Sequence, residues 1–237
     1  GPKNLVMKAA ILLSHECHVQ TGADILLKKR IPVSAGLGGG SSNAAFTLLG
    51  LDRLWNLGLS KKKLMAIGAK LGSDVPFFIL EESYALASGR GEILKPLNLK
   101  PRKALWHCLV KPSFGNSTKE VYARLSRQRL SHRRLSDQRL TPKKVDVRML
   151  LRSLGKGDSK SLSKLLVNSL ELALDKRVKK IFDIKKKLIF EGAIASLMSG
   201  SGSAVFGLFR TEKEARRAAR RLRQMHKNWQ VFVASTY

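Results

Sequence analysis

The segment from Pro32 to Ala45, PVSAGLGGGSSNAA, constrains this chain more than any other feature. It places four glycines within five residues. Glycine has no side chain, so backbone N–H groups there can approach an anion closely. Ser41, Ser42 and Asn43 then enter a predicted helix, whose first N–H groups and positive dipole end favour phosphate. The segment therefore predicts a phosphate-binding loop at the start of a helix.

This loop differs from two common phosphate-binding patterns. It is not a Walker A loop, because no Gly-Lys-Ser/Thr follows the glycines. It does not fit G-x-G-x-x-G either, because Ser41 and Asn43 occupy the positions of the third glycine. The serine hydroxyls could bind phosphate oxygens or Mg²⁺. A flexible turn that caps a helix is the alternative, which the length of the segment, Pro32 and the double serine make unfavourable.

A second segment, LGSDVPFF, runs from Leu71 to Phe78. Asp74 follows the helix-ending Gly72 and precedes an apolar run that we expect to be a strand. Phosphoryl transfer needs a group that orients or deprotonates the attacking hydroxyl, and a carboxylate in such a position can do this. An ordinary turn aspartate is the alternative.

Two further segments carry polar turns. MSGSGSAVF, from Met198 to Phe206, places a Gly/Ser turn between two predicted strands. It is either a close approach of the backbone to a ligand or a tight hairpin. KPSFGNSTKEVY, from Lys111 to Tyr122, predicts a strand end followed by a helix. Ser117 or Thr118 could cap that helix, with Glu120 completing a capping box.

The net charge of +28 over 237 residues is unusual. Much of the excess lies in Arg124–Lys144 and Arg210–Arg223, which we interpret as the solvated surface of a protein with anionic partners. Nucleic acid is an unlikely main ligand, because neither stretch carries the interleaved aromatic residues that stack on single strands. Cys17 and Cys108 make neither a disulfide framework nor a zinc set. No run of eighteen apolar residues predicts a membrane span, and we expect no signal peptide.

Hydrophobic periodicity predicts separated strands among helices, which indicates an α+β fold. The predicted helices are 5–13, 42–55, 61–71 (capped by Ser60 and ended by Gly72), 118–129, 145–154, 160–172, 178–191 and 212–225. The predicted strands are 23–27, 75–80, 83–87, 93–94, 104–110, 193–198, 204–209 and 229–234. Gly89-Arg90-Gly91 predicts a turn, and a change of composition at 96–103 predicts a domain boundary.

In this order, the four segments resemble the GHMP kinase superfamily and, within it, the 4-diphosphocytidyl-2-C-methyl-D-erythritol kinase family. The resemblance covers nearly the whole chain and includes NLVMKAA, KKRIPVSAGLGGGSSNAA and GRGEIL. It implies a two-domain α+β GHMP kinase fold. Residues 1–100 would form an N-terminally truncated ATP-binding domain, and residues 101–237 a C-terminal ferredoxin-like α/β sandwich.

The resemblance implies an enzyme that uses ATP and Mg²⁺ to phosphorylate the 2-hydroxyl of 4-diphosphocytidyl-2-C-methyl-D-erythritol in non-mevalonate isoprenoid precursor biosynthesis. Asp74 matches the catalytic aspartate, and no protein side chain is expected to bind a metal by itself. The positions that match ATP-binding residues are Asn4, Lys29, Pro32, Val33, Ser34, Ala35, Gly36, Leu37, Gly38, Gly39, Gly40, Ser41, Ser42 and Asn43. The positions that match the substrate side are Thr118, Tyr122, Ser199, Gly200, Ser201 and Gly202. For Asn4, Lys29 and Tyr122, a purely structural role is a serious alternative.

The sequence departs from the family pattern at its front. The lysine-bearing strand with a K-x-N motif and the segment that grips cytidine do not occur here. We therefore expect residues 1–237 by themselves to phosphorylate the substrate poorly.

Two alternatives stay open: another GHMP small-molecule kinase, acting on mevalonate, homoserine or a sugar, and a non-catalytic, basic nucleic-acid-binding protein. The expected partner is a small cytidine diphosphate substrate, with no membrane partner. The expected location is the bacterial cytoplasm, with the plastid stroma as the alternative. The sequence does not predict an oligomeric state.

Overall fold

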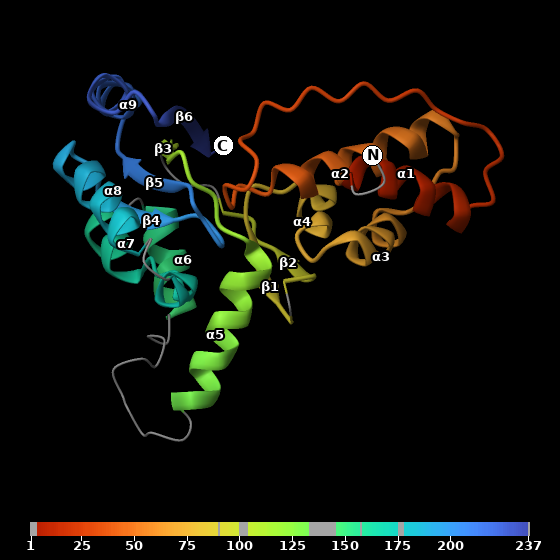
Figure 1. Ribbon diagram of the computed structural model, residues 1–237. Coiled ribbons are helices and arrows are strands. Elements are labelled where there is room, and N and C mark those ends of the chain that lie inside the picture. Colours follow the sequence, from red (N-terminus) through yellow and green to blue (C-terminus); the bar gives the residue numbers. More distant parts are fainter. Residues whose placement is uncertain are drawn as a thin grey trace. The chain divides into compact units, whose positions relative to one another are not determined.

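The computed structural model describes residues 4–89, 91–99, 104–132, 146–156, 158–174 and 178–236. The chain divides into two compact units (Figure 1). The first unit comprises Gly1–Val33 and Gly38–Asn98, and the second comprises Ser34–Leu37 and Leu99–Tyr237. The boundary between them thus crosses the glycine segment twice. None of the helices in the described residues is long and apolar enough to cross a membrane.

Within its described residues, the first unit contains four helices and a hairpin. These are α1 (Leu5–Glu16), α2 (Gly39–Leu54), α3 (Lys61–Leu71), α4 (Val75–Leu80), β1 (Ala85–Ser88) and β2 (Ile93–Pro96). Helix α2 packs against both α1 and α4, and α3 packs against α4 (Figure 1). Buried aliphatic side chains from all four helices, including Leu13, Leu48, Ile67 and Ile79, form its core.

Local capping explains where two of these helices begin. Asn4 Oδ1 accepts a hydrogen bond from Val6 N–H at 3.2 Å, which starts α1. Ser60 Oγ accepts one from Lys63 N–H at 3.2 Å, and α3 ends before Gly72. The predicted helix 61–71 and its cap are therefore confirmed. The predicted helix 42–55 is also confirmed, although α2 begins three residues earlier, at Gly39.

The predicted strand 75–80 is wrong, because these residues form helix α4. Pro76 lies in the first turn, where a proline needs no N–H donor. Val75 and Ile79 are one helical turn apart and both contact α3 at Gly68, where a Cβ would lie 3.0 Å and 2.7 Å from them. A short apolar run does not reveal its period, and here tertiary packing selects the helix.

The predicted strand 23–27 is also wrong. These residues have no regular structure, and among the described residues no strand pairs with them. An apolar run becomes a strand only where a neighbouring strand completes its hydrogen-bond ladder. The predicted turn at 89–91 between two strands is confirmed. Strand β1 pairs antiparallel with β2, and Gly91 N–H donates to Ser88 O at 3.0 Å. Arg90 of that turn lies outside the described residues.

The second unit is built on an antiparallel sheet of order β4-β5-β3-β6. Its strands are β3 (Leu105–Lys111), β4 (Ala195–Met198), β5 (Val205–Phe209) and β6 (Gln230–Thr236). Helices α8 (Val178–Phe190) and α9 (Glu212–Met225) pack on it, α8 against β4 and β5, and α9 against β3, β5 and β6. The crossover helices α8 and α9 and this strand order are those of a ferredoxin-like sandwich. The predicted sandwich is therefore confirmed.

The core of this unit lies between the sheet and its helices. Cys108 and Phe209 are fully buried, and so are Leu188 of α8 and Leu222 of α9. Burial raises the pKa of the Cys108 thiol to about 12, so Cys108 is an inert core residue. A capping box between Thr211 and Glu214 starts α9.

The remaining helices of the second unit connect β3 to α8 along the chain. They are α5 (Thr118–His132), α6 (Val147–Lys156), α7 (Ser159–Leu165) and the 3₁₀ helix η2 (Ser169–Ala173). The predicted single helix 160–172 is wrong, because α7 and η2 are separate. Asn168 Oδ1 accepts a hydrogen bond from Leu170 N–H at 3.0 Å, and this local bond starts a new helix. Much of the basic stretch Arg124–Lys144 lies outside the described residues.

Candidate functional site

The second half of the glycine segment forms an open helix start in the first unit. Helix α2 begins at Gly39, and its first helical hydrogen bond runs from Ser42 N–H to Gly38 O at 2.8 Å. The N–H groups of Gly39, Gly40 and Ser41 precede that bond, and they have no partner within the described residues. No side chain caps the helix, and no acidic residue lies in its first turn. These donors and the helix dipole can therefore act on an anion.

Packing explains two of these glycines. Gly38 has a φ of +65°, and a Cβ on it would lie 2.8 Å from Cζ of Phe78. A Cβ on Gly39 would lie 2.9 Å from Cγ2 of Ile31. The two serines that follow differ. Ser42 is buried and its Oγ donates to Gly39 O at 3.0 Å, whereas the hydroxyl of Ser41 has no partner in the described part of the chain.

The first half of the glycine segment belongs to the second unit and is tied to the turn between β4 and β5. Ala35 O accepts a hydrogen bond from Ala204 N–H at 2.9 Å, and Gly36 O accepts one from Ser199 Oγ at 2.8 Å. Gly36 has a φ of +74°, and a Cβ on it would lie 2.1 Å from Ser199 O and 2.8 Å from Gly202 N. The structure thus brings together two segments that the sequence separates by more than 160 residues.

The Met198–Phe206 segment is a hairpin turn. Ser199 N–H donates to Ala204 O at 2.9 Å, and Gly202 N–H donates to Ser199 O at 2.8 Å. The hairpin interpretation of this segment is therefore confirmed. Gly36 packs against the same turn. The glycines of the turn therefore also allow the backbone of the glycine segment to approach closely.

Two residues at the start of η2 and within it, which the sequence did not single out, form hydrogen bonds to this turn. Asn168 Nδ2 donates to Met198 O at 2.9 Å and to Gly200 O at 2.8 Å. Glu171 is buried; one carboxylate oxygen accepts from Met198 N–H at 2.8 Å, and the other accepts from Lys185 Nζ at 2.6 Å. The only sequence signal for Glu171 is an acidic residue among the apolar positions of an amphipathic pattern.

The Lys111–Tyr122 segment contacts the same turn. Asn116 Nδ2 donates to Ser201 O at 3.0 Å, and the hydroxyls of Thr118 and Ser201 are 2.8 Å apart. Ser117 Oγ accepts from Glu120 N–H at 3.4 Å at the start of α5, so Ser117 rather than Thr118 is the cap. Tyr122, one turn further along α5, is 54% exposed, so it is available to a ligand and is not a core residue.

Asp74 immediately precedes α4 in the first unit. Its side chain is exposed and makes no hydrogen bond or ion pair with any residue that the structure describes. An exposed carboxylate without an internal partner remains free to accept a proton or a hydrogen bond from a ligand hydroxyl.

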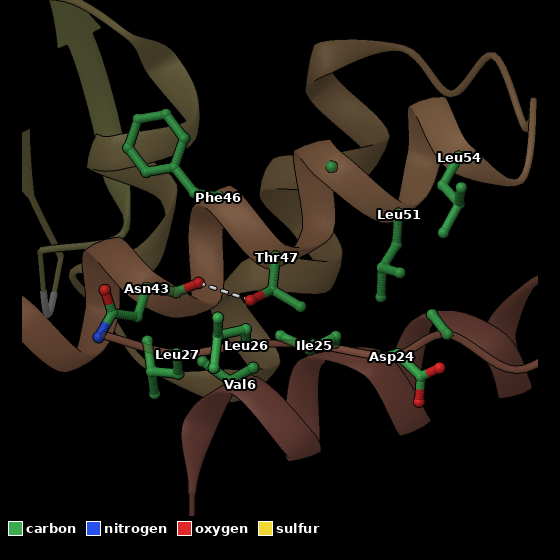
Figure 2. A pocket seen from close by; sticks show the side chains of 12 residues that line it. Val6, Asp24, Ile25, Leu26, Leu27, Asn43, Phe46, Thr47, Leu51 and Leu54 are labelled. Atoms are coloured by element: carbon green, nitrogen blue, oxygen red, sulfur yellow. Dashed lines mark hydrogen bonds between the residues drawn. The ribbon is translucent and has the colours of Figure 1, made fainter. Parts of the chain in front are cut away.

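The three other predicted nucleotide contacts, Asn4, Lys29 and Asn43, have different surroundings. Asn4 uses Oδ1 to cap α1. Lys29 is exposed in a segment without regular structure. Asn43 lies at one end of an apolar groove of about 370 Å³ along α2 (Figure 2). Thr47 Oγ1 donates to Asn43 O at 2.7 Å there, and Leu27 lies beside the Asn43 side chain (Figure 2). The rest of the groove is lined mainly by Val6, Ile25, Leu26, Phe46, Leu51 and Leu54.

Within the described part of the chain, side chains that commonly bind metals do not cluster at this site. Across the residues that the structure describes, no three or more His, Cys, Asp or Glu side chains gather closely enough to hold an ion.

The chain is similar in sequence to known proteins along most of its length. Residues 4–82 match the GHMP kinases N terminal domain, and residues 150–228 match the GHMP kinases C terminal domain. The 4-diphosphocytidyl-2-C-methyl-D-erythritol kinase of Pelotomaculum thermopropionicum is 44% identical over 100% of this chain and 77% of that protein. The protein of the same name from Alkaliphilus oremlandii is 40% identical over 99% of this chain and 75% of its own length.

Solved structures give the same result. A crystal structure of 4-(cytidine 5'-diphospho)-2C-methyl-D-erythritol kinase has a TM-score of 0.80 at 34% identity, and the alignment covers 99% of this chain and 78% of that one. Homoserine kinase from Cytophaga hutchinsonii aligns with a TM-score of 0.73 at 18% identity, over 99% of this chain and 76% of that one. The second likeness shows the fold alone.

Proposed function

Since the chain belongs to the 4-diphosphocytidyl-2-C-methyl-D-erythritol kinase family of the GHMP kinases, we propose that it transfers the γ-phosphoryl group of ATP to the 2-hydroxyl of 4-diphosphocytidyl-2-C-methyl-D-erythritol. This reaction belongs to non-mevalonate isoprenoid precursor biosynthesis. The observation that carries the proposal is the open, uncapped start of α2 behind the glycines. It supplies the phosphate-binding donors that an ATP-dependent kinase requires.

The glycine segment holds the ATP phosphates. The free N–H groups of Gly39, Gly40 and Ser41 donate to phosphate oxygens, and the α2 dipole stabilises their charge. Such donors act in the transition state without reorganising, because the helix already fixes them. The first half of the segment, Pro32–Leu37, shapes the loop, and its hydrogen bonds to the β4–β5 turn keep Ala35 and Gly36 in place.

Asp74 acts on the alcohol. Its carboxylate accepts the hydrogen bond of the 2-hydroxyl, orients that oxygen toward the γ-phosphorus, and takes its proton as the new bond forms. The support from the structure is that Asp74 is exposed and has no other partner among the described residues.

The substrate side is assigned to Thr118, Tyr122 and the turn Ser199–Gly202. The exposed ring of Tyr122 is suited to stack on the cytosine. The Thr118 and Ser201 hydroxyls are hydrogen-bonded at 2.8 Å, and the one that accepts this bond can donate to a diphosphate. Asn4, Lys29 and Asn43 are assigned to the nucleoside of ATP. The groove beside Asn43 supports the assignment of Asn43, because its apolar walls suit a purine better than they suit phosphate.

Magnesium fits a site of this kind. Mg²⁺ keeps several waters and takes substrate phosphates with one or two carboxylates, so it needs no protein cluster. The Ser41 hydroxyl and the Asp74 carboxylate are the side chains available to it. When bound, Mg²⁺ neutralises charge on the transferred phosphoryl group.

We place the ATP-binding domain at residues 1–100 and the C-terminal domain at residues 101–237. The compact units support a division near Asn98, with Ser34–Leu37 as an exception. We place the protein in the bacterial cytoplasm, which the bacterial origin of its curated relatives supports over a plastid.

The test is phosphoryl transfer with a panel of alcohols. The protein is incubated with ATP, Mg²⁺ and 4-diphosphocytidyl-2-C-methyl-D-erythritol, mevalonate or homoserine, and product is identified by ³¹P NMR and mass spectrometry. We expect a 2-phosphorylated product only with the cytidine substrate, and its loss in Asp74→Asn with ATP affinity retained. Transfer to another alcohol of the panel instead would overturn the proposal. So would salt-sensitive oligonucleotide binding with no ATP binding.

A further inference from the structure

A second cavity lies in the second unit and shares no residue with the roles assigned above. Its volume is about 730 Å³, within the range of small-molecule sites. It is bordered by α8, by the end of α9 with the loop that follows, and by the loop after β3. The lining residues are Pro112, Ser113, Phe114, Lys180, Asp183, Ile184, Lys187, Gln224, Met225, His226, Lys227, Asn228 and Trp229.

The lining is positively charged. Lys180 and Lys187 come from α8 and Lys227 from the loop after α9, against the single carboxylate of Asp183. None of these four side chains forms an ion pair with a described residue. Three unpaired ammonium groups around one cavity create a field that favours an anion with more than one charge.

His226 adds a buried donor or acceptor to this charged wall. Its ring stacks on Trp229 with centroids 3.8 Å apart, and its Nε2 is buried with no hydrogen-bond partner among the described residues. Buried polar atoms in native proteins are nearly always hydrogen-bonded, so an unpartnered one calls for a missing partner. Burial, together with nearby Lys187, lowers the pKa of His226, so an anion bound beside the ring would raise it.

The cavity also offers apolar surface. Ile184 is buried beneath it, and the Phe114 ring lies 5.7 Å from Lys180 Nζ. Met225 is 55% exposed at its edge. A ligand could therefore place a small organic body on this surface while its charged end meets the lysines.

We infer that this cavity binds a small organic diphosphate, separately from the ATP and alcohol sites. The three lysines meet the diphosphate, with the His226 imidazole in the wall beside them, and Ile184, Phe114 and Met225 meet the organic body. The inference rests on the lining of this cavity alone and does not depend on the proposed kinase activity.

Inorganic pyrophosphate is the probe for the charged end. It is titrated at 150 mM salt with a non-hydrolysable ATP analogue at saturation, so that the glycine segment is occupied. Binding is followed through the indole N–H signal of Trp229, which a Trp229→Phe variant assigns. We expect saturable binding, weakened more than tenfold in Lys187→Ala/Lys227→Ala.

The matched control is Lys186→Ala/Lys213→Ala, which removes the same charge from the chain's α8 and α9 but from residues outside the lining. We expect this variant to bind pyrophosphate within twofold of the unmodified protein. Equal weakening in both double variants would show general surface attraction and would overturn the inference. So would a Trp229 signal that does not respond to pyrophosphate.

Histidine titration supplies an independent readout. The charged groups that line the cavity with His226 are Lys180, Asp183 and Lys187 from α8 and Lys227 from its own loop. A bound anion favours the protonated imidazole, so pyrophosphate should raise the pKa of His226 measured by NMR. An unchanged or lowered pKa at saturating pyrophosphate would contradict the assignment.

Discussion

The two halves of the glycine segment both contain glycine but serve different purposes. In the first half the backbone carbonyls of Ala35 and Gly36 accept hydrogen bonds from the β4–β5 turn, and Gly36 lies against backbone atoms of that turn. In Gly38–Asn43 the glycines neighbour side-chain atoms of Phe78, Ile31 and Leu5, and three helical N–H groups have no partner among the described residues. A glycine-rich motif can therefore combine glycines required by packing with glycines required for access of a ligand.

The difference is physical. A Cβ at Gly36 would meet Ser199 O and Gly202 N, both in the second unit, whereas at Gly40 it would meet only Cδ1 of Leu5, at 3.3 Å. Substitution in the first half should therefore lower the free energy of unfolding, and substitution in the second half should mainly lower the affinity for ATP. Each prediction below tests one part of that contrast.

The largest effect is expected for Gly36→Ala. Its methyl group would lie 2.1 Å from Ser199 O, at a φ that alanine disfavours, so the loop and the turn must separate. We expect a loss of about 3 kcal/mol or more in the free energy of unfolding, measured by urea denaturation.

Gly50→Ala in α2 is the matched control, because nothing lies within 4 Å of its Cβ position. It should stabilise the protein by up to about 1 kcal/mol. If Gly36→Ala were as stable as this control, the packing role of Gly36 would be refuted.

A smaller effect is expected for Asn168→Asp. The variant keeps the oxygen that starts η2 but replaces the donor to Met198 O and Gly200 O with a second acceptor. We expect a loss of about 1–3 kcal/mol in unfolding free energy. Thermal denaturation of this variant and of Asn168→Ala provides the check. An Asn168→Asp protein as stable as the unmodified protein would show that these two bonds contribute little.

Gly38→Ala should have a mixed effect. The residue has a φ of +65°, and its new methyl group would lie 2.8 Å from the end of the Phe78 ring, which can turn away. We expect a loss of about 1–2 kcal/mol in unfolding free energy, and isothermal titration should show weaker ATP binding. Unchanged ATP affinity would show that Gly38 is required for packing and not for access of ATP.

Gly40→Ala should change stability least. Gly40 lies in the helix, where alanine is favoured, so unfolding should shift by no more than about 0.5 kcal/mol. Helical Cβ atoms tilt toward the N-terminus, so the methyl group would crowd the phosphate-binding N–H groups. We expect ATP affinity to fall by about tenfold, or about 1.4 kcal/mol. Unchanged ATP affinity in a stable Gly40→Ala protein would show that Gly40 is not needed for access of the phosphates.

The sequence predicted most elements because capping signals and periodicity are local. Ser60 and Gly72 delimit α3 as predicted, and the α+β sandwich follows from the order of helices and strands. The run 75–80 was misread because six apolar residues carry no period, and packing against Gly68 decided it. Residues 23–27 were misread because a strand depends on a partner that propensity does not reveal.

The candidate site was predictable only in part. The glycines, Asp74 and Thr118 belong to recognisable segments, so their residue types point to a chemistry. Asn168 and Glu171 act by holding Met198 and Gly200, which are distant in sequence. Such long-range bonds leave no local pattern, and only the folded chain shows them.

The most direct test of the central claim is the response of individual backbone amides to ATP. In ¹H–¹⁵N spectra of the protein, addition of ATP with Mg²⁺ should shift the amide signals of Gly39, Gly40 and Ser41 more than those of any other residues in the described chain. A phosphate bound elsewhere would leave these three signals in place while other signals move. That result would contradict the assignment of the open α2 start as the ATP phosphate site.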